Sequence, residues 1–210
     1  TKEAWPTTDR PEFLDLSSEG KYLTFTQYNT DLKNEFQAEK QVLSIADSTT
    51  ERIGLGLQAT WANTQQKLFT GTDQSLYVSG AKQLSPRQAL PSSIPNEVNT
   101  TEAYEFAAWS PDDQYIIFNK RFDKTYLYQP ANEEYTSIKS NLGAYHWLDT
   151  ESFLAVKDDE LHRYNTDSLD SPMPLGITVE ALKQIDLSPN GKRVAHITKD
   201  RNLYLSDWDG

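Results

Sequence analysis

The feature that most constrains this chain is a short motif that recurs along its length. In the clearest copy, the large apolar residue Trp109 is followed by a polar turn, Ser110–Asp113. Proline presets φ in such a turn, and Ser and Asp side chains bond to nearby backbone N–H groups. Two short strands rich in β-branched and aromatic residues come next, Tyr115–Phe118 and Thr125–Tyr128. The motif therefore predicts a β-hairpin that begins at a large apolar anchor residue.

Four further copies share this template, and three of them lack the Ser-Pro pair: the first has Ser17-Ser18 in its place, and the copies at Trp61 and Trp147 depart from the turn altogether. The five anchors are Leu16, Trp61, Trp109, Trp147 and Leu187. Nine positions after them, in one register, stand Phe25, Thr70, Phe118, Val156 and His196. We expect the buried core to contain Leu16, Phe25, Trp61, Trp109, Phe118, Trp147 and Leu187.

The spacing of the copies indicates the architecture. Successive anchors are separated by 45, 48, 38 and 40 residues. A period of about 40–45 residues that contains several short strands is the size of one four-stranded propeller blade. A β-sandwich with hairpins that recur by chance is the alternative, and five copies in one register argue against it. We predict an all-β propeller with about five repeats, in a single domain that spans residues 1–210.

The motif also resembles a known family. An apolar residue, Ser-Pro, Asp or Asn, and then Gly-Lys before a strand, as at Leu187–Lys192, is similar to the repeat of TolB-type β-propellers. Such repeats also occur in propeller domains of prolyl oligopeptidase-like peptidases and in extracytoplasmic parts of ToxR/CadC-like transcriptional regulators. The resemblance covers Phe13 to Gly210 and implies four-stranded blades and a bacterial, periplasmic protein. The turns near Trp61 and Trp147 depart from the pattern, so blade boundaries are least defined there.

Composition limits the partners of the chain. The net charge is −11, which disfavours binding to nucleic acid or to an anionic membrane. The basic pair Lys120-Arg121 is interpreted as part of a solvated hairpin loop. There is no cysteine, so disulfides and thiolate ligands are excluded. No apolar run reaches the ~20 residues that span a membrane.

Several segments interrupt the repeats. The lead-in around Trp5 is expected to dock on the ring, with a disordered tail as the alternative. Helical turns are expected, if anywhere, at Asp31–Lys40 and Thr178–Lys183. Two proline-containing stretches, Ser85–Thr101 and Asn165–Lys183, are interpreted as excursions between blades, with a boundary between two half-domains as the alternative for the first.

The residues that often act in catalysis or bind metals are each explained better by a structural role in the fold. His196 is expected to be a packed histidine, and His146 and His162 lie apart from any nucleophile in sequence. Serines that follow anchors are interpreted as turn residues, as are the acidic pairs; these are Ser17, Ser110, Ser188, Asp112-Asp113 and Asp158-Asp159. The segment Asp207–Gly210 resembles only the start of a calcium loop. We therefore expect no catalytic residue, no cofactor and no metal.

Two classes of function remain. The first is a non-catalytic module that binds a protein or small ligand at its loops or channel mouth, as in TolB or a ToxR/CadC-like sensor. The second is the propeller of a prolyl oligopeptidase-like peptidase whose catalytic domain is elsewhere. A Gly-x-Ser-x-Gly motif and a histidine encoded downstream would favour the peptidase. An upstream winged helix and a membrane span would favour the regulator.

The fifth copy is shorter than the others. A further apolar segment, Tyr135–Ile138, follows the hairpin of the third copy and is expected to form an outer strand, whereas only Ser206–Gly210 follow Leu205. The sequence therefore predicts an open edge. A fragment of a longer protein, closure by the Trp5 segment and exchange of a strand with another subunit are the three explanations considered.

Overall fold

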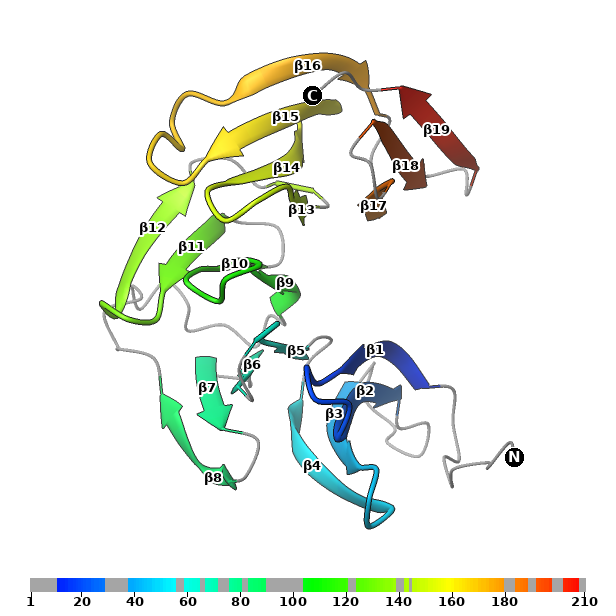
Figure 1. Ribbon diagram of the computed structural model, residues 1–210, viewed down its shortest axis with the longest axis vertical. Coiled ribbons are helices and arrows are strands. Elements are labelled where there is room, and N and C mark those ends of the chain that lie inside the picture. Colours follow the sequence, from blue (N-terminus) through cyan, green and yellow to red (C-terminus); the bar gives the residue numbers. More distant parts are fainter. Residues whose placement is uncertain are drawn as a thin grey trace.

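A computed structural model gives the arrangement of the chain (Figure 1). The structure describes residues 11–28, 38–55, 59–64, 67–71, 76–80, 83–89, 104–120, 124–138, 142–143, 145–179, 184–188, 192–197 and 202–207. These residues form β-strands joined by turns, and no helix occurs among them. The described part consequently contains no helix that is long and apolar enough to cross a membrane.

The strands form five small antiparallel sheets, numbered here in chain order. Sheet 1 contains β1 (Pro11–Leu16), β2 (Tyr22–Tyr28), β3 (Ala38–Ser44) and β4 (Thr49–Leu55). Sheet 2 contains β5 (Ala59–Trp61), β6 (Lys67–Gly71), β7 (Leu76–Gly80) and β8 (Gln83–Ala89). Sheet 3 contains β9 (Tyr104–Trp109), β10 (Ile116–Lys120), β11 (Thr125–Gln129) and β12 (Glu134–Ile138). Sheet 4 contains β13 (Tyr145–Trp147), β14 (Ser152–Lys157), β15 (Glu160–Asn165) and β16 (Met173–Thr178). Sheet 5 contains β17 (Gln184–Leu187), β18 (Arg193–Ile197) and β19 (Leu203–Asp207).

Each sheet is a simple meander in which strands pair in chain order. The sheets follow one another around an arc, with the first strand of each sheet on the inside (Figure 1). This is the arrangement of a β-propeller, so the predictions of an all-β chain and of a propeller fold are confirmed. Sheet 5 has three strands among the described residues, in agreement with the shorter fifth copy.

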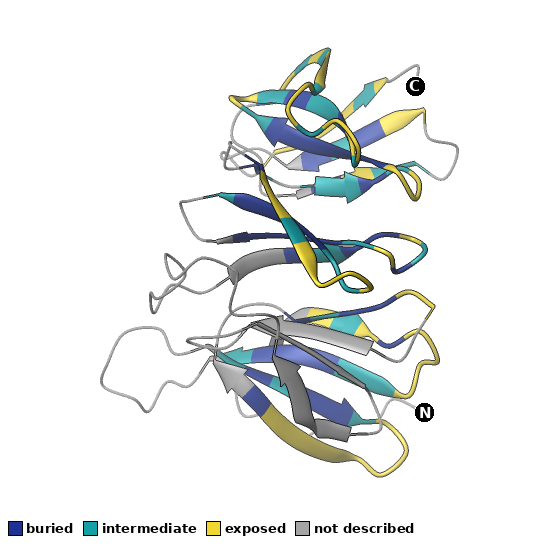
Figure 2. Cartoon of the chain, turned by 90° about the vertical axis from the view of Figure 1, so that its left-hand side faces the viewer, coloured by how far each residue is buried: buried dark blue, intermediate teal, exposed yellow. Residues whose placement is uncertain are grey.

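The core lies between the sheets. Four clusters of buried side chains each join two neighbouring sheets, in the order 1–2, 2–3, 3–4 and 4–5. Strands in the middle of the arc are covered on both faces, which is why consecutive residues Ile116, Ile117 and Phe118 are all fully buried. Figure 2 shows this burial in the strands and exposure at the hairpin turns. We call the face of a sheet that packs on the preceding sheet its leading face, and the opposite face its trailing face.

Most of the predicted core is confirmed. Phe25, Trp61, Trp109, Phe118 and Trp147 are buried, and Leu187 is half-buried against the cluster between sheets 4 and 5. Leu16 is the exception, because 53% of it is exposed. It shares the leading face of sheet 1 with Phe25 and Leu43, which are buried, so the exposure belongs to its place on β1 and not to the whole face.

The prediction of one register fails in the fourth copy. Trp109 pairs with Ile116, seven residues later, whereas Trp147 pairs with Phe153, six residues later. The residue equivalent to Phe118 is therefore Ala155, and Val156 faces sheet 5 instead. A turn that is one residue shorter moves every following side chain to the opposite face.

Three predicted irregular segments contain strands. The helical expectation at Asp31–Lys40 is wrong at its end, because β3 begins at Ala38, and residues 31–37 lie outside the described part. The first excursion was placed too early, because β8 runs to Ala89 through Pro86, and the second contains a strand, β16, which includes Pro174. Both are outermost strands, where a residue without an N–H does not interrupt a ladder on its outer side. At Thr178–Lys183, Thr178 is the last residue of β16 and residues 180–183 are outside the described part.

Candidate functional site

In four of the five sheets, the inner strand carries a polar side chain just before the anchor; in sheet 3 this residue is Ala108. In sheet 1 this is Asp15, whose Oδ2 accepts a hydrogen bond from the backbone N–H of Trp61 in sheet 2 at 2.8 Å. In sheet 4 it is His146, whose Nδ1 lies 3.5 Å from Oδ1 of Asp186 in sheet 5. Because this position points towards the next sheet, its polar side chains join neighbouring inner strands.

The anchor tryptophans make a second contact between sheets. Trp109 donates its indole Nε1–H to the carbonyl oxygen of Thr60 at 3.1 Å, and Trp147 donates to that of Ala108 at 3.4 Å. Each acceptor directly precedes the anchor of the preceding sheet. The indole of Trp61 does not repeat this bond, since its buried Nε1 has no partner in the described structure.

A third repeated contact is aromatic. Tyr22 stacks on Trp61 with ring centroids 5.8 Å apart, and Tyr115 stacks on Trp147 at 6.4 Å, both with an interplanar angle of 24°. Each tyrosine stands six positions after its own anchor and faces the anchor of the next sheet. Anchors therefore bind neighbouring sheets through both their ring faces and their N–H groups.

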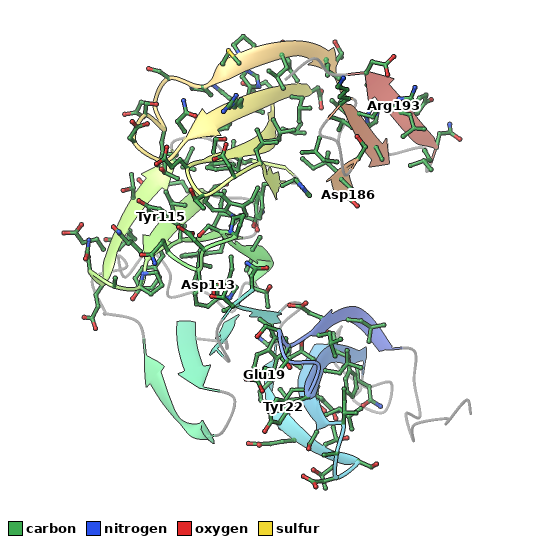
Figure 3. All side chains as sticks on the ribbon, viewed as in Figure 1. Glu19, Tyr22, Asp113, Tyr115, Asp186 and Arg193 are labelled. Carbon is green, nitrogen blue, oxygen red and sulfur yellow. The ribbon has the colours of Figure 1, made fainter. Side chains whose placement is uncertain are left out.

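Asp113 forms several hydrogen bonds between two sheets. Its carboxylate accepts hydrogen bonds from the backbone N–H groups of Asn63 and Thr64, at 2.6 and 2.8 Å, and from the Thr64 hydroxyl at 2.5 Å. The residue is buried and has a positive φ of 59°. Figure 3 shows it between sheets 3 and 2. Asp113 is thus more than the turn residue that the sequence predicts.

The anchor serines have the predicted turn role. In Ser17, Ser110 and Ser188, the backbone N–H donates a hydrogen bond to the carbonyl oxygen of the residue five positions later, at 2.9 Å. The hydroxyl oxygen of each accepts the N–H of that same residue, with distances of 3.0 Å to Tyr22, 2.9 Å to Tyr115 and 2.9 Å to Arg193. The three hydroxyls therefore stabilise the turns, and none of these hydrogen bonds involves a histidine.

The three histidines lie on separate strands. His196 is buried and stacks on Tyr204 with centroids 5.5 Å apart, which matches the stacking of Phe118 on Tyr126 at the equivalent place in sheet 3. Burial lowers the pKa of His196. His162 is half-buried on β15, and its Nδ1 lies 3.0 Å from the carbonyl oxygen of Glu160. The prediction that His196 is a packed residue is confirmed.

No family model and no curated protein matches this sequence. Its sites are therefore assigned from geometry alone. Within the described ranges, no group of three His, Asp or Glu side chains is arranged to hold a metal ion. Apart from Asp113, the acidic pairs have local roles: Asp112 Oδ1 accepts the N–H of Gln114, and Asp158 and Asp159 occupy the positive-φ positions of a hairpin turn. Asp207 pairs with Arg193, and residues 208–210 lie outside the described part.

The remaining candidate is the pair His146 and Asp186 on the inner strands β13 and β17. Their side chains are 34% and 73% exposed, so both are accessible from solvent. Burial lowers the pKa of His146, and the nearby Asp186 carboxylate partly opposes that shift. Figure 3 shows Asp186 beside the inner side of the arc. The sequence did not single out this pair, because 40 residues separate its members; only the shared position before an anchor connects them.

Proposed function

We propose that the chain is a non-catalytic interaction or sensing module built on a propeller of five TolB-type repeats. This proposal rests on one observation: the residues that could take part in chemistry have structural roles instead. Tryptophans, serines and the buried aspartate that would attract attention in sequence are engaged in holding turns and joining sheets. Such a scaffold presents its inner strands and loops to a partner without chemistry of its own.

The proposed ligand surface is centred on His146 and Asp186. Imidazole and carboxylate groups 3.5 Å apart offer both donor and acceptor atoms to a polar ligand, and both side chains are accessible from solvent. Acidic character, with a net charge of −11, favours a neutral or cationic ligand over a nucleic acid. By its resemblance to TolB-type propellers, such as ToxR/CadC-like sensory domains, we place the module in a bacterial periplasm.

A titration followed by NMR tests this function. ¹⁵N-labelled protein would be titrated with a panel of short cationic peptides and of small polyamines, and backbone amide shifts recorded. We expect saturable shifts at His146 and Asp186, and their loss in His146→Ala and Asp186→Ala. His162→Ala, a half-buried histidine on β15, is the matched control and should bind normally. Binding that maps to β16 or to outer turns, or that survives both inner-strand substitutions, would refute the proposed surface.

A further inference from the structure

The inner strands of sheets 4 and 5 meet through an ionisable pair of side chains. The residues just before the five anchors are, in chain order, Asp15, Thr60, Ala108, His146 and Asp186. Among consecutive members of this series, only His146 and Asp186 are both ionisable, and Nδ1 and Oδ1 of the two lie 3.5 Å apart. The carboxylate of Asp15 is occupied instead by the backbone N–H of Trp61, at 2.8 Å. The contact between sheets 4 and 5 therefore has a chemistry that the other contacts lack.

Asp186 presents one of its carboxylate oxygens to solvent. Its Oδ1 accepts the backbone N–H of Leu187 at 2.8 Å and also faces Nδ1 of His146. Its Oδ2 makes no hydrogen bond or ion pair with any residue that the structure describes. The side chain is largely exposed and lies beside the inner side of the arc (Figure 3). A donor group on a ligand therefore reaches Oδ2 without displacing a described protein group.

His146 offers a second acceptor atom when it is neutral. Burial lowers its pKa, and the Asp186 carboxylate partly opposes that shift, so the imidazole is uncharged at neutral and alkaline pH. A neutral imidazole carries one N–H, and the proton is favoured on Nδ1 because Nδ1 faces the carboxylate. Nε2 then has a lone pair and makes no hydrogen bond to a described residue. Two acceptors with one negative charge suit a cation that carries N–H donors, an ammonium or a guanidinium.

The surroundings of His146 on the two facing sheets are mostly apolar. The cluster of buried side chains between the trailing face of sheet 4 and the leading face of sheet 5 contains no charged group. Besides His146, the described titratable side chains on these two faces are Arg163, His196 and Tyr204. Arg163 lies 3.8 Å from the Asp149 carboxylate, and the other two stack on each other. Asp186 is therefore the carboxylate that faces His146.

We infer that the ligand surface binds an organic cation in exchange for a proton on His146. The inference rests on the function proposed above and adds the class of ligand and its control by pH. Neutral His146 leaves the charge of Asp186 to the cation. Protonated His146 instead pairs with that carboxylate at 3.5 Å and repels a second positive charge beside it. Proton and cation therefore exclude each other, and each weakens the binding of the other by the same factor.

An NMR titration of the full chain with agmatine tests this exchange. The guanidinium of agmatine keeps its charge between about pH 5 and about pH 8. Backbone amide shifts give the Kd at each pH, and the ring protons of His146 give its pKa. We expect the Kd to be about twice its alkaline value at the pH that equals the pKa of His146, and to rise about tenfold per pH unit below it. Saturating agmatine should in turn lower the pKa of His146.

Three variants identify the groups that take part. His146→Gln has no proton to exchange, so it should weaken binding at pH 8 and remove the pH dependence of the Kd. Asp186→Asn should weaken binding about tenfold or more, the usual effect of losing a hydrogen bond to a charged group. It should also lower the pKa of His146 further, because the carboxylate that opposes burial is gone. His162→Gln on β15 is the matched control and should keep both the Kd and its pH dependence.

The outcomes separate this inference from the proposed function. Binding that maps to His146 and Asp186 with the same Kd at pH 5 and pH 8 overturns the exchange alone, as does a pKa of His146 that agmatine leaves unchanged. A chain that binds agmatine at no pH also overturns the inference. The proposed function falls with it only if the whole panel of cationic peptides and polyamines fails to bind.

Discussion

At the residue scale, a few side chains hold neighbouring sheets together. Trp109 packs among buried residues of sheets 2 and 3 and donates to the Thr60 carbonyl, so its removal affects both packing and a hydrogen bond. Trp109→Ala should lower the free energy of unfolding by about 3–5 kcal/mol, the usual cost of truncating a buried aromatic. Denaturant unfolding measures this change in the free energy of unfolding, with Leu203→Ala as a control at an exposed position. A loss below about 1 kcal/mol would show that the indole is not buried between sheets.

Asp113 gives a polar counterpart. Asp113→Asn tolerates the positive φ but cannot accept all three hydrogen bonds from Asn63 and Thr64. We expect a loss of about 1–3 kcal/mol, because the amide NH₂ at the buried position 113 would face a backbone N–H in place of an acceptor. Asp112→Asn, in the same turn but bonded only within sheet 3 in these contacts, should cost less. Equal effects of the two substitutions would mean that the bonds to sheet 2 do not form.

His196 makes stability depend on pH. Burial lowers its pKa below the ordinary value of 6.5, so at mildly acidic pH the unfolded chain binds more protons at this residue than the folded chain. The free energy of unfolding should therefore decrease as the pH falls through 6.5. His196→Phe copies the Phe118–Tyr126 stack and should flatten this dependence between about pH 7 and pH 5. An unchanged slope would show that His196 titrates as freely in the fold as in the unfolded chain.

At the element scale, the hairpins were predictable, and so was the outer strand at Tyr135–Ile138, which is β12; the outer strands that contain proline were not. Inner and middle strands contain anchors and Leu-Tyr patterns, which mark them in sequence. β8 and β16 contain Pro86 and Pro174, and proline is a signal against strands unless the edge position is known. That position depends on which strands pair, and no local pattern encodes pairing. The hydrogen bonds between sheets could not be predicted for the same reason, since 50 residues separate Asp113 from Asn63.

The turn between β14 and β15 offers a test at this scale. Asp158 and Asp159 both have positive φ, 53° and 62°, in a two-residue hairpin connection where glycine is favoured at the second place. Asp159→Gly should stabilise the fold by up to about 1 kcal/mol, because it removes the left-handed backbone penalty. Asp167→Gly, in a turn where φ is not positive, should instead destabilise it through greater freedom of the unfolded chain. The melting temperatures of both variants, from thermal unfolding, test this prediction. A lower melting temperature for Asp159→Gly would contradict the turn geometry.

At the scale of the whole molecule, the repeat determines the arc and the core between sheets. The period of the anchors was sufficient to predict an all-β propeller, because each anchor marks one inner strand and its contact with the preceding sheet. The exposure of Leu16 could not be predicted from that period. It belongs to the place of Leu16 on β1, because Phe25 on the same face of sheet 1 is buried, and a repeat pattern treats every copy alike.

The central claim is that anchor tryptophans join consecutive sheets, and nuclear Overhauser spectroscopy of the indole N–H protons tests it most directly. The account predicts cross-peaks from Trp109 Hε1 to protons of Thr60 and Ala62 in sheet 2, and from Trp147 Hε1 to protons of Ala108 in sheet 3. Both sets should disappear in the corresponding Trp→Phe variants, which lack the indole proton. Cross-peaks confined to residues of each tryptophan's own sheet would contradict the claim, because the sheets would then not be joined through their anchors.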